Sequence, residues 1–266
     1  MLKVSRNTHR SCRDIYLRCT ELSEVKIMTY QTTFKRYELK YLLTQMEKAQ
    51  ILRAMQSYMK LDKYGRTIIR NIYFDTDTFR LIRRSLEKPA YKEKLRVRSY
   101  QMTSSDDPVF VELKKKYKSV VYKRRLVLPE AQVMECFRSG IPLPVHSQIA
   151  DEIEYFREYY QTLHPTVFLS YEREAYYALD GSDFRVTFDE NILYRKENFS
   201  LGAEIYGSSL LDRKETLMEI KTSGGIPIWM SHLLTQQKVF KTSFSKYGSA
   251  YQEMLTNGDK GGLKYA

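Results

Sequence analysis

The segment 91–100, YKEKLRVRSY, carries a cation at every second residue: Lys92, Lys94, Arg96 and Arg98. A period of two is typical of a β-strand, whose successive side chains point to opposite faces. Cations that share one face can bind phosphate, because arginine contacts phosphate oxygens through a planar fork and lysine supplies a mobile positive charge. The alternative is an ordinary strand whose charged face is exposed to water.

Seven strand-like segments share this one-sided distribution of charge. The opposite faces are mostly apolar, as at Leu95 and Val97, and arginine and lysine dominate the charged faces where a solvated face would mix both signs. If the sheet closes into a barrel with its apolar face outward beneath helices, the charged faces line a lumen. Segment by segment, the charged faces carry Arg36, Glu38 and Lys40; Lys94, Arg96 and Arg98; Glu112 and Lys114; Lys123 and Arg125; Arg173; Arg185, Thr187 and Asp189; and Glu219 and Lys221.

Such a lumen favours an anionic ligand on energetic grounds. Two like charges 4 Å apart repel by about 4 kcal/mol at an effective dielectric constant of 20. Several such pairs are comparable with the roughly 5–15 kcal/mol of net stability of a domain. Lumenal acids, water and counterions offset part of this repulsion, and a run of phosphates would offset the rest.

The remaining chain supplies the elements that must position these residues. Strands are predicted for 34–43, 67–75, 91–100, 109–117, 119–128, 166–179, 183–195 and 216–222. Helices are predicted for 44–61, which begins with a capping box at Thr44 and Glu47, and for 79–87, 129–140, 147–163, 230–240 and 243–256. No repeat or low-complexity linker divides these elements, so one antiparallel-rich α+β domain over residues 29–256 is expected.

The composition restricts the class of protein. The chain has 266 residues, of which 42% are hydrophobic, and a net charge of +12, so it can bury a sizeable core and an anionic partner is expected. Its three cysteines form no disulfide or zinc pattern, which favours a reducing compartment. No apolar run approaches the roughly 18 residues of a membrane span. We therefore expect a cytoplasmic location and no transmembrane segment in this chain, with a separate membrane partner left open.

The two ends of the chain lack the patterning of the domain. Residues 1–28 are basic and have no apolar core of a signal peptide. They are predicted to be a disordered extension or the result of a mis-assigned start codon, the alternative being a basic targeting segment. Residues 257–266 are predicted to form a flexible tail.

An ordered series of short motifs resembles the triphosphate tunnel metalloenzyme superfamily, and more narrowly the catalytic domain of the vacuolar transporter chaperone (VTC) polyphosphate polymerases. The motifs span about residues 34–251 and read FKRYELKYLL, IYFDTDTF, SLEKPAYKEKLRVRSY, VFVELKKK, VYKRRL, YERE, FRVTFD, LMEIKT and FSKYGSAY. The resemblance implies an antiparallel β-barrel tunnel of about eight strands, with helices outside and a C-terminal helix near the tunnel mouth.

The resemblance also implies roles for individual residues. Arg96, Arg98, Arg173 and Arg185 would clamp a triphosphate, and Glu219 would hold Mn²⁺ or Mg²⁺ against its oxygens. Further phosphate contacts are implied for Lys40, Lys114, Lys123 and Lys246. Arg36, Lys94, Arg125 and Lys221 share the same faces and are additional candidates, unless they only pair with Glu38, Glu112 or Glu219.

Two departures from the family pattern bear on function. Tunnel hydrolases open with Glu-x-Glu-x-Lys, whereas the first acid is here replaced by Arg36. This loss of a carboxylate argues against the two-metal hydrolytic form and for the polymerase branch. Ser85 stands where the eukaryotic polymerases have an arginine, and Lys92 or Lys94 could replace that cation.

The implied activity is transfer of the ATP γ-phosphoryl group onto a growing polyphosphate chain, so the expected partners are ATP and inorganic polyphosphate. One alternative is a nucleoside or inorganic triphosphatase on the same fold, and another is a non-catalytic module that binds polyphosphate or nucleotides. Nucleic acid is not expected as a partner, because Tyr37, Tyr41 and Tyr122 alternate away from the cationic faces where bases would stack.

Overall fold

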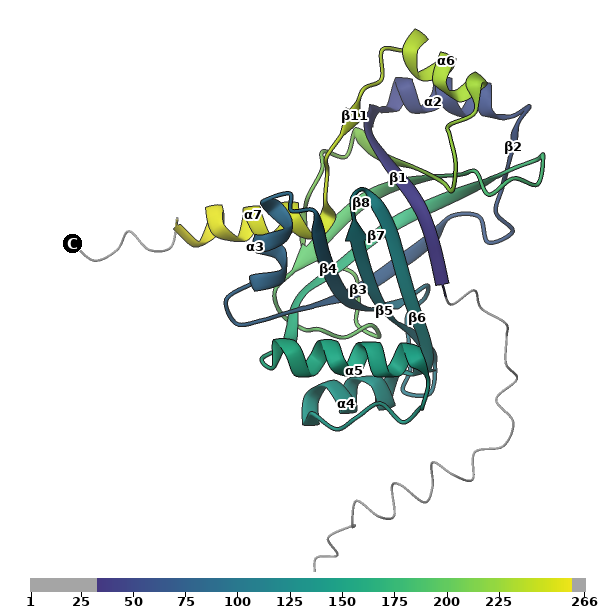
Figure 1. Cartoon of the computed structure of the whole chain (residues 1–266). Coiled ribbons are helices and arrows are strands. Elements are labelled where there is room, and N and C mark those ends of the chain that lie inside the picture. Colours follow the sequence, from purple (N-terminus) through teal and green to yellow (C-terminus); the bar gives the residue numbers. More distant parts are fainter. Residues whose placement is uncertain (1–32, 260–266) are drawn as a thin grey trace, which may run out of the picture. The chain divides into compact units, whose positions relative to one another are not determined.

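Antiparallel strands form the centre of the protein in the computed structural model, which describes residues 33–259 (Figure 1). Within this part of the chain, eight strands pair in a closed order, β7–β3–β4–β5–β6–β1–β10–β8 and back to β7. Their bounds are β1 Thr33–Thr44, β3 Thr67–Asp75, β4 Tyr91–Ser99, β5 Pro108–Tyr117, β6 Val120–Pro129, β7 His164–Ala178, β8 Arg185–Arg195 and β10 Glu215–Thr222. The short strands β2 Met59–Leu61, β9 Ser208–Ser209 and β11 Lys241–Thr242 pair with β7, β8 and β1.

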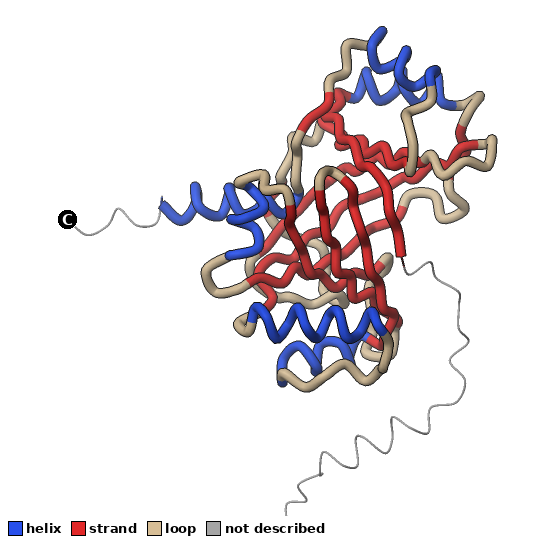
Figure 2. Tube along the Cα trace, viewed as in Figure 1, coloured by secondary structure: helices blue, strands red, loops and turns tan. Residues whose placement is uncertain are grey.

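Two pairs of helices cover the outside of this ring (Figure 2). Helices α4 (Glu130–Ser139) and α5 (Gln148–Tyr160) pack on outward side chains of β4 and β5, among them Leu95 and Val111. Helices α2 (Gln45–Met55) and α6 (Ile228–Gln236) pack on β1, β8 and β10, for example on Met218. The apolar side chains beneath these four helices therefore point outward, and the prediction of an α+β fold with an antiparallel tunnel is confirmed.

The first helix is shorter than the sequence predicts. Its capping box is present, since the Thr44 side chain accepts from Glu47 N–H and the Glu47 carboxylate accepts from Thr44 N–H. The helix ends at Met55, however, and Met59 pairs with Ala178 in the sheet. Tyr58 stacks on Trp229 of α6 with ring centroids 4.3 Å apart. Met59 is thus buried by long-range pairing and Tyr58 is held by stacking, and these contacts override the local helical spacing.

Asp75, at the end of β3, joins helices α3 (Arg80–Leu86) and α7 (Lys246–Asp259). Its carboxylate is fully buried and accepts hydrogen bonds from the backbone N–H groups of Leu81 and Ile82 at 2.8 and 3.0 Å. It also accepts one from the Tyr247 hydroxyl at 2.8 Å. A single side chain therefore caps α3 and ties α7 to the ring.

Replacing Asp75 by alanine is expected to lower the free energy of unfolding by about 3 kcal/mol, because buried N–H and O–H donors lose their acceptor. Urea denaturation measures this change. Asp77→Ala is the matched control: its side chain is mostly exposed and contacts His164 only at the surface, so a change within about 0.5 kcal/mol is expected. Equal effects of the two substitutions would contradict the assignment.

No helix among residues 33–259 is both long enough and apolar enough to cross a membrane. Residues 1–32 and 260–266 lie outside the described part of the chain, and with them most of both predicted terminal segments. The backbone of α7 remains helical through Asp259. The domain limits given above stay predictions.

Candidate functional site

The inner face of the ring carries the charged side chains that the sequence singles out. Ion pairs that skip a strand show this directly: Lys114 on β5 contacts Glu38 on β1 at 2.6 Å, and Arg173 on β7 contacts Glu219 on β10 at 3.3 Å. The cations of this lining are Arg36, Lys40, Lys94, Arg96, Arg98, Lys114, Lys123, Arg125, Arg173, Arg185, Lys221 and, from α7, Lys246. The carboxylates are Glu38, Glu112, Asp189 and Glu219, so cations outnumber acids.

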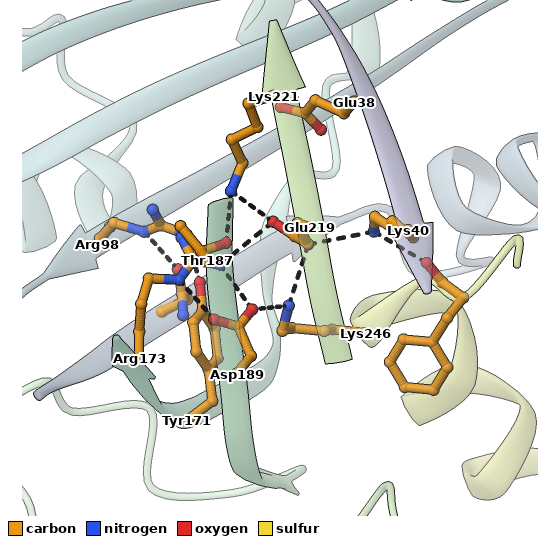
Figure 3. A network of polar contacts seen from close by, with 12 residues as sticks. Glu38, Lys40, Arg98, Tyr171, Arg173, Thr187, Asp189, Glu219, Lys221 and Lys246 are labelled. Atoms are coloured by element: carbon orange, nitrogen blue, oxygen red, sulfur yellow. Dashed lines mark hydrogen bonds and ion pairs between the residues drawn. The ribbon is translucent and has the colours of Figure 1, made fainter. Parts of the chain in front are cut away.

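Glu219 is the centre of one cluster (Figure 3). Its carboxylate lies 2.8 Å from Lys221 Nζ, 3.3 Å from both Lys246 Nζ and Arg173 Nη2, and 3.5 Å from Lys40 Nζ. Burial alone would raise the pKa of Glu219, but these cations hold it well below its usual range. The carboxylate is therefore ionised at neutral pH and shared by four cations.

Asp189 extends this cluster toward α7. It is fully buried and accepts two hydrogen bonds from Arg173, at 2.5 Å from Nε and 2.6 Å from Nη2, and one from Lys246 Nζ at 2.5 Å. Lys246 thus bridges Asp189 and Glu219. From the sequence, Asp189 shares a face with Arg185, but the structure pairs it with Arg173 instead.

Glu112 is the centre of a second cluster and has no solvent exposure. Its oxygens lie 2.6 Å from Lys123 Nζ, 2.7 Å from Arg96 Nη2, 2.7 Å from Arg125 Nη2 and 3.9 Å from Arg98 Nε. Burial acts to raise the pKa of Glu112, yet Lys123 and the three arginines lower it well below the usual range. This single carboxylate organises the cations of β4 and β6.

Neutral side chains fix the two arginines of β4. Arg96 Nη1 donates to the Tyr73 hydroxyl at 2.9 Å. Arg98 donates from Nε to Asn71 Oδ1 and from Nη2 to the Tyr171 hydroxyl, both at 2.8 Å. Each guanidinium is consequently held in one orientation before any ligand arrives, which is favourable for tight phosphate recognition.

Lysines dominate the lining near the start of α7. Lys94 lies opposite Lys114 in the β4–β5 pairing, and its Nζ donates to the Ser245 hydroxyl at 3.1 Å. Within the described residues Lys94 has no ion pair with a carboxylate. Burial, followed by the charges of Lys40 and Lys114, lowers its pKa well below the usual range. Lys92 donates to the backbone carbonyl of Ser85 at 3.0 Å, so a cation does lie beside that serine.

Binding of tripolyphosphate is expected to take up protons at mildly alkaline pH. Because the folded-state pKa of Lys94 lies well below its ordinary value, the amine is neutral over part of the pH range in which an ordinary lysine is charged, and adjacent phosphate charge would reprotonate it. Up to about one proton per chain should come from this residue. Calorimetric titrations in buffers of different ionisation enthalpy measure the uptake. Lys94→Met should reduce it, whereas an unchanged value in that variant would contradict the role of Lys94.

Arg185 differs from the other arginines of the lining. Its Nε atom is buried and has no hydrogen-bond partner among the described residues, and its nearest carboxylate, Asp62, is 3.9 Å away. The guanidinium lies 4.5 Å from the centre of the Tyr177 ring. Burial lowers its pKa, although an arginine remains charged at neutral pH. Arg185 is therefore free to accept a new anionic partner.

The carboxylates suit a divalent cation only in the company of phosphate. No group of three or more His, Cys, Asp or Glu side chains among residues 33–259 forms a ready metal cage. Mg²⁺ is commonly bound by one or two carboxylates while substrate phosphates supply further oxygens. Glu219 and Asp189 fit that requirement, because both carboxylates contact the Lys246 amine and so lie close together.

The structure brings the sequence-predicted site residues together on the inner face of the ring, with Lys246 added from α7, and it also shows site residues that the sequence did not predict. Tyr73, Tyr171 and Asn71 orient Arg96 and Arg98, and Glu112 acts as a hub rather than a single ion-pair partner. The alternation that placed Arg173 on the inner face places Tyr171 there too, so a strict period-two reading could have found it.

Solved structures share this fold. A candidate adenylate cyclase from Bacillus halodurans superposes with a TM-score of 0.51 at 14% identity, over 81% of this chain and 96% of that one. HpAC1 from Hippeastrum, a candidate adenylyl cyclase with a dominant triphosphatase activity, gives a TM-score of 0.51 at 13% identity, over 84% of this chain and 96% of that one. The fold is thus that of the CYTH-like triphosphate tunnel proteins.

The sequence assigns the chain within this class. Residues 35–255 match the VTC domain, and the chain belongs to the VTC domain family, which confirms the resemblance seen in its motifs. A comparison with curated proteins gives no match.

Proposed function

We propose that the protein is a polyphosphate polymerase, which transfers the γ-phosphoryl group of ATP onto the end of an inorganic polyphosphate chain and depends on a divalent metal. The observation that supports this most strongly is the excess of oriented cations inside a closed ring of strands in a VTC-family chain. A polyanion that threads the ring would neutralise this excess along its whole length.

The transfer step requires no protein nucleophile. A terminal phosphate oxygen of the growing chain attacks the γ-phosphorus, the bond between that phosphorus and the oxygen bridging to the β-phosphate breaks, and ADP leaves with the electron pair. Catalysis then depends on positioning and on neutralising negative charge. Arg96, Arg98, Arg173 and Arg185 would hold the phosphates in line.

The remaining site residues would bind and neutralise the chain on either side of the reacting group. Mn²⁺ or Mg²⁺ held by Glu219 would supply positive charge to the phosphate oxygens. Lysines contribute mobile charges that can follow a moving chain. The lysines assigned to this role are Lys40, Lys94, Lys114, Lys123, Lys221 and Lys246.

The internal carboxylates explain how such a site is stable without substrate. The Glu112 carboxylate lies 2.7 Å from Arg96 and 2.6 Å from Lys123. It therefore takes the position that phosphate oxygens would take when substrate binds. Substrate binding then exchanges one set of charge-assisted hydrogen bonds for another, so the guanidinium groups need not be desolvated anew. Enclosure within the ring would also limit water, which favours transfer over hydrolysis.

The direct test is to incubate the purified chain with ATP and Mn²⁺ or Mg²⁺. Products are separated on a gel stained for polyphosphate, and free phosphate is measured in parallel. A ladder of chains with little free phosphate is expected. Binding of tripolyphosphate without any turnover would instead indicate a non-catalytic binding module.

A triphosphatase is the second candidate, and the triphosphatase activity of the structurally similar Hippeastrum protein favours it. Such an enzyme would release phosphate and build no chain in the same assay. Against it stands Arg36, which lies 3.9 Å from Glu38 and places a cation where hydrolytic relatives have a carboxylate.

A further inference from the structure

A second group of cations lies on the outside of the ring, away from the tunnel. Arg70 precedes Asn71 in β3, and because Asn71 binds Arg98 inside the ring, Arg70 points to the outer face. Arg70 lies opposite Ser170 of β7 and opposite Ser99 of β4. Arg70 is only 5% exposed and Ser170 only 1%.

Polar atoms of this group lack partners. In the part of the chain that the structure describes, neither Arg70 Nε nor Ser170 Oγ makes a hydrogen bond, and both atoms are buried. Thr103 Oγ1, in the loop after β4, is a third such atom. Burial lowers the pKa of Arg70, and Glu204 is near enough to oppose that shift in part but forms no ion pair with Arg70. An enclosed guanidinium without an acceptor is costly unless an anion or water completes it.

A second buried arginine, Arg195, lies near Arg70. It stacks on the Phe168 ring, with its central carbon 3.5 Å from the ring centre, and donates from Nη2 to the Asn198 carbonyl at 2.9 Å. Burial and the nearby charge of Arg70 both act to lower the pKa of Arg195. Two buried arginines, neither in an ion pair with a described carboxylate, therefore lie close together.

The loop that Arg195 holds is fixed against the loop that carries Thr103. Gly202 approaches this second loop so closely that a Cβ atom on it would lie 2.4 Å from the Thr103 carbonyl oxygen. Leu201, beside it, is completely buried in the outer hydrophobic cluster. The loop that Arg195 holds is thus packed tightly against the loop that carries Thr103.

We infer that Arg70 and Ser170 bind a phosphate group at this outer position, distinct from the tunnel. An unpartnered guanidinium Nε–H and an unpartnered hydroxyl, carried by paired residues of neighbouring strands, suit the oxygens of a tetrahedral oxyanion, and its charge would relieve the repulsion between Arg70 and Arg195. The phosphate can be free orthophosphate or the terminal group of a polyphosphate chain. This inference does not depend on the proposed polymerase activity.

The outer site is adjacent in the chain to a residue that faces the tunnel. Arg70 and Asn71 are adjacent in β3, and Asn71 orients Arg98 while its side-chain amide donates to the Leu169 carbonyl at 3.0 Å. A phosphate bound to Arg70 would hold the strand segment that positions Arg98. The outer site could in this way couple phosphate concentration to the affinity of the tunnel, by biasing the same backbone segment.

Crystals of the full chain soaked in tungstate, a tetrahedral oxyanion with strong anomalous scattering, test the inference. We expect one anomalous peak within hydrogen-bond distance of Arg70 Nε and Ser170 Oγ. Arg70→Gln should abolish that peak and leave peaks inside the tunnel, which also shows that the variant folds. Ser170→Ala should weaken it, and Arg53→Gln, on the exposed face of α2, should leave it unchanged.

Displacement of the outer peak identifies the source of the phosphate. Orthophosphate is expected to displace tungstate, because the enclosed Nε suits a small ligand; displacement by tripolyphosphate alone would assign the site to a chain terminus. If neither displaces it, tungstate is an adventitious ion only and the inference fails. It also fails if wild-type crystals show the Glu204 carboxylate or water on Arg70 and tungstate only in the tunnel.

Discussion

Replacing Glu219 by glutamine is expected to reduce synthesis of polyphosphate from ATP by roughly 100-fold or more, as removal of a metal ligand or a central electrostatic group typically does. Glutamine keeps the size of the side chain but removes the charge that Lys221, Lys246, Arg173 and Lys40 share. Initial rates of chain formation at saturating Mn²⁺ measure the loss, and circular dichroism reports whether the fold is retained.

The control for this variant is Glu38→Gln, which removes another carboxylate of the lining. Glu38 contacts Lys114 at 2.6 Å and has no ion pair with Lys246 among the described residues. The Glu38→Gln variant should therefore lose far less activity than Glu219→Gln. Equal losses in both variants would show that only total charge matters, and full activity of Glu219→Gln would remove Glu219 as the metal ligand.

Seven strands of the ring were predictable because each carries its own period-two signal, and the eighth because its segment is rich in β-branched and aromatic residues. The segment 67–75 was predicted as a strand, and β3 has those bounds. The pattern alone allowed the charged faces to be either enclosed or solvated, and the closed tunnel was implied by the family resemblance. Strand β2 was missed because Met59 is held by pairing with β7, more than one hundred residues later in the chain.

The detailed contacts of the site were less accessible from the sequence. Asn71 and Arg98 are 27 positions apart, and Arg98 and Tyr171 are 73 apart, so no local pattern connects them. The alternation places Asp189 on one strand face with Arg185, while its partner Arg173 lies on the neighbouring strand. Register decides such pairings, and register is fixed by the whole sheet.

The balance of charge in the tunnel links the site to stability. Repulsion among the lining cations was the expectation, and the structure shows that a few carboxylates, each shared among several cations, offset much of it. Stability without substrate should therefore depend on these acids more than on any single cation. Glu112, which has no exposed surface, is the extreme case.

Replacing Glu112 by glutamine is accordingly expected to lower the free energy of unfolding by about 3–5 kcal/mol, the usual result of breaking a buried charge cluster on one side. Lys123, Arg96 and Arg125 would lose their shared partner. Urea denaturation of the substrate-free protein measures the change. Glu152→Gln, which removes two partly exposed ion pairs, with Lys115 and with Arg124, on the outer face, should cost less than about 1 kcal/mol.

Two further measurements on Glu112→Gln separate electrostatics from packing. Because cations lower the pKa of Glu112 in the folded state, its contribution is present above its unfolded pKa and disappears as the pH falls through the folded value. The variant should therefore lose less stability than wild type on acidification. Tripolyphosphate should stabilise the variant more than the wild type, since its charge replaces the missing carboxylate. A variant that tripolyphosphate fails to rescue would show that Glu112 supports packing alone, and that the cations around it do not face the ligand.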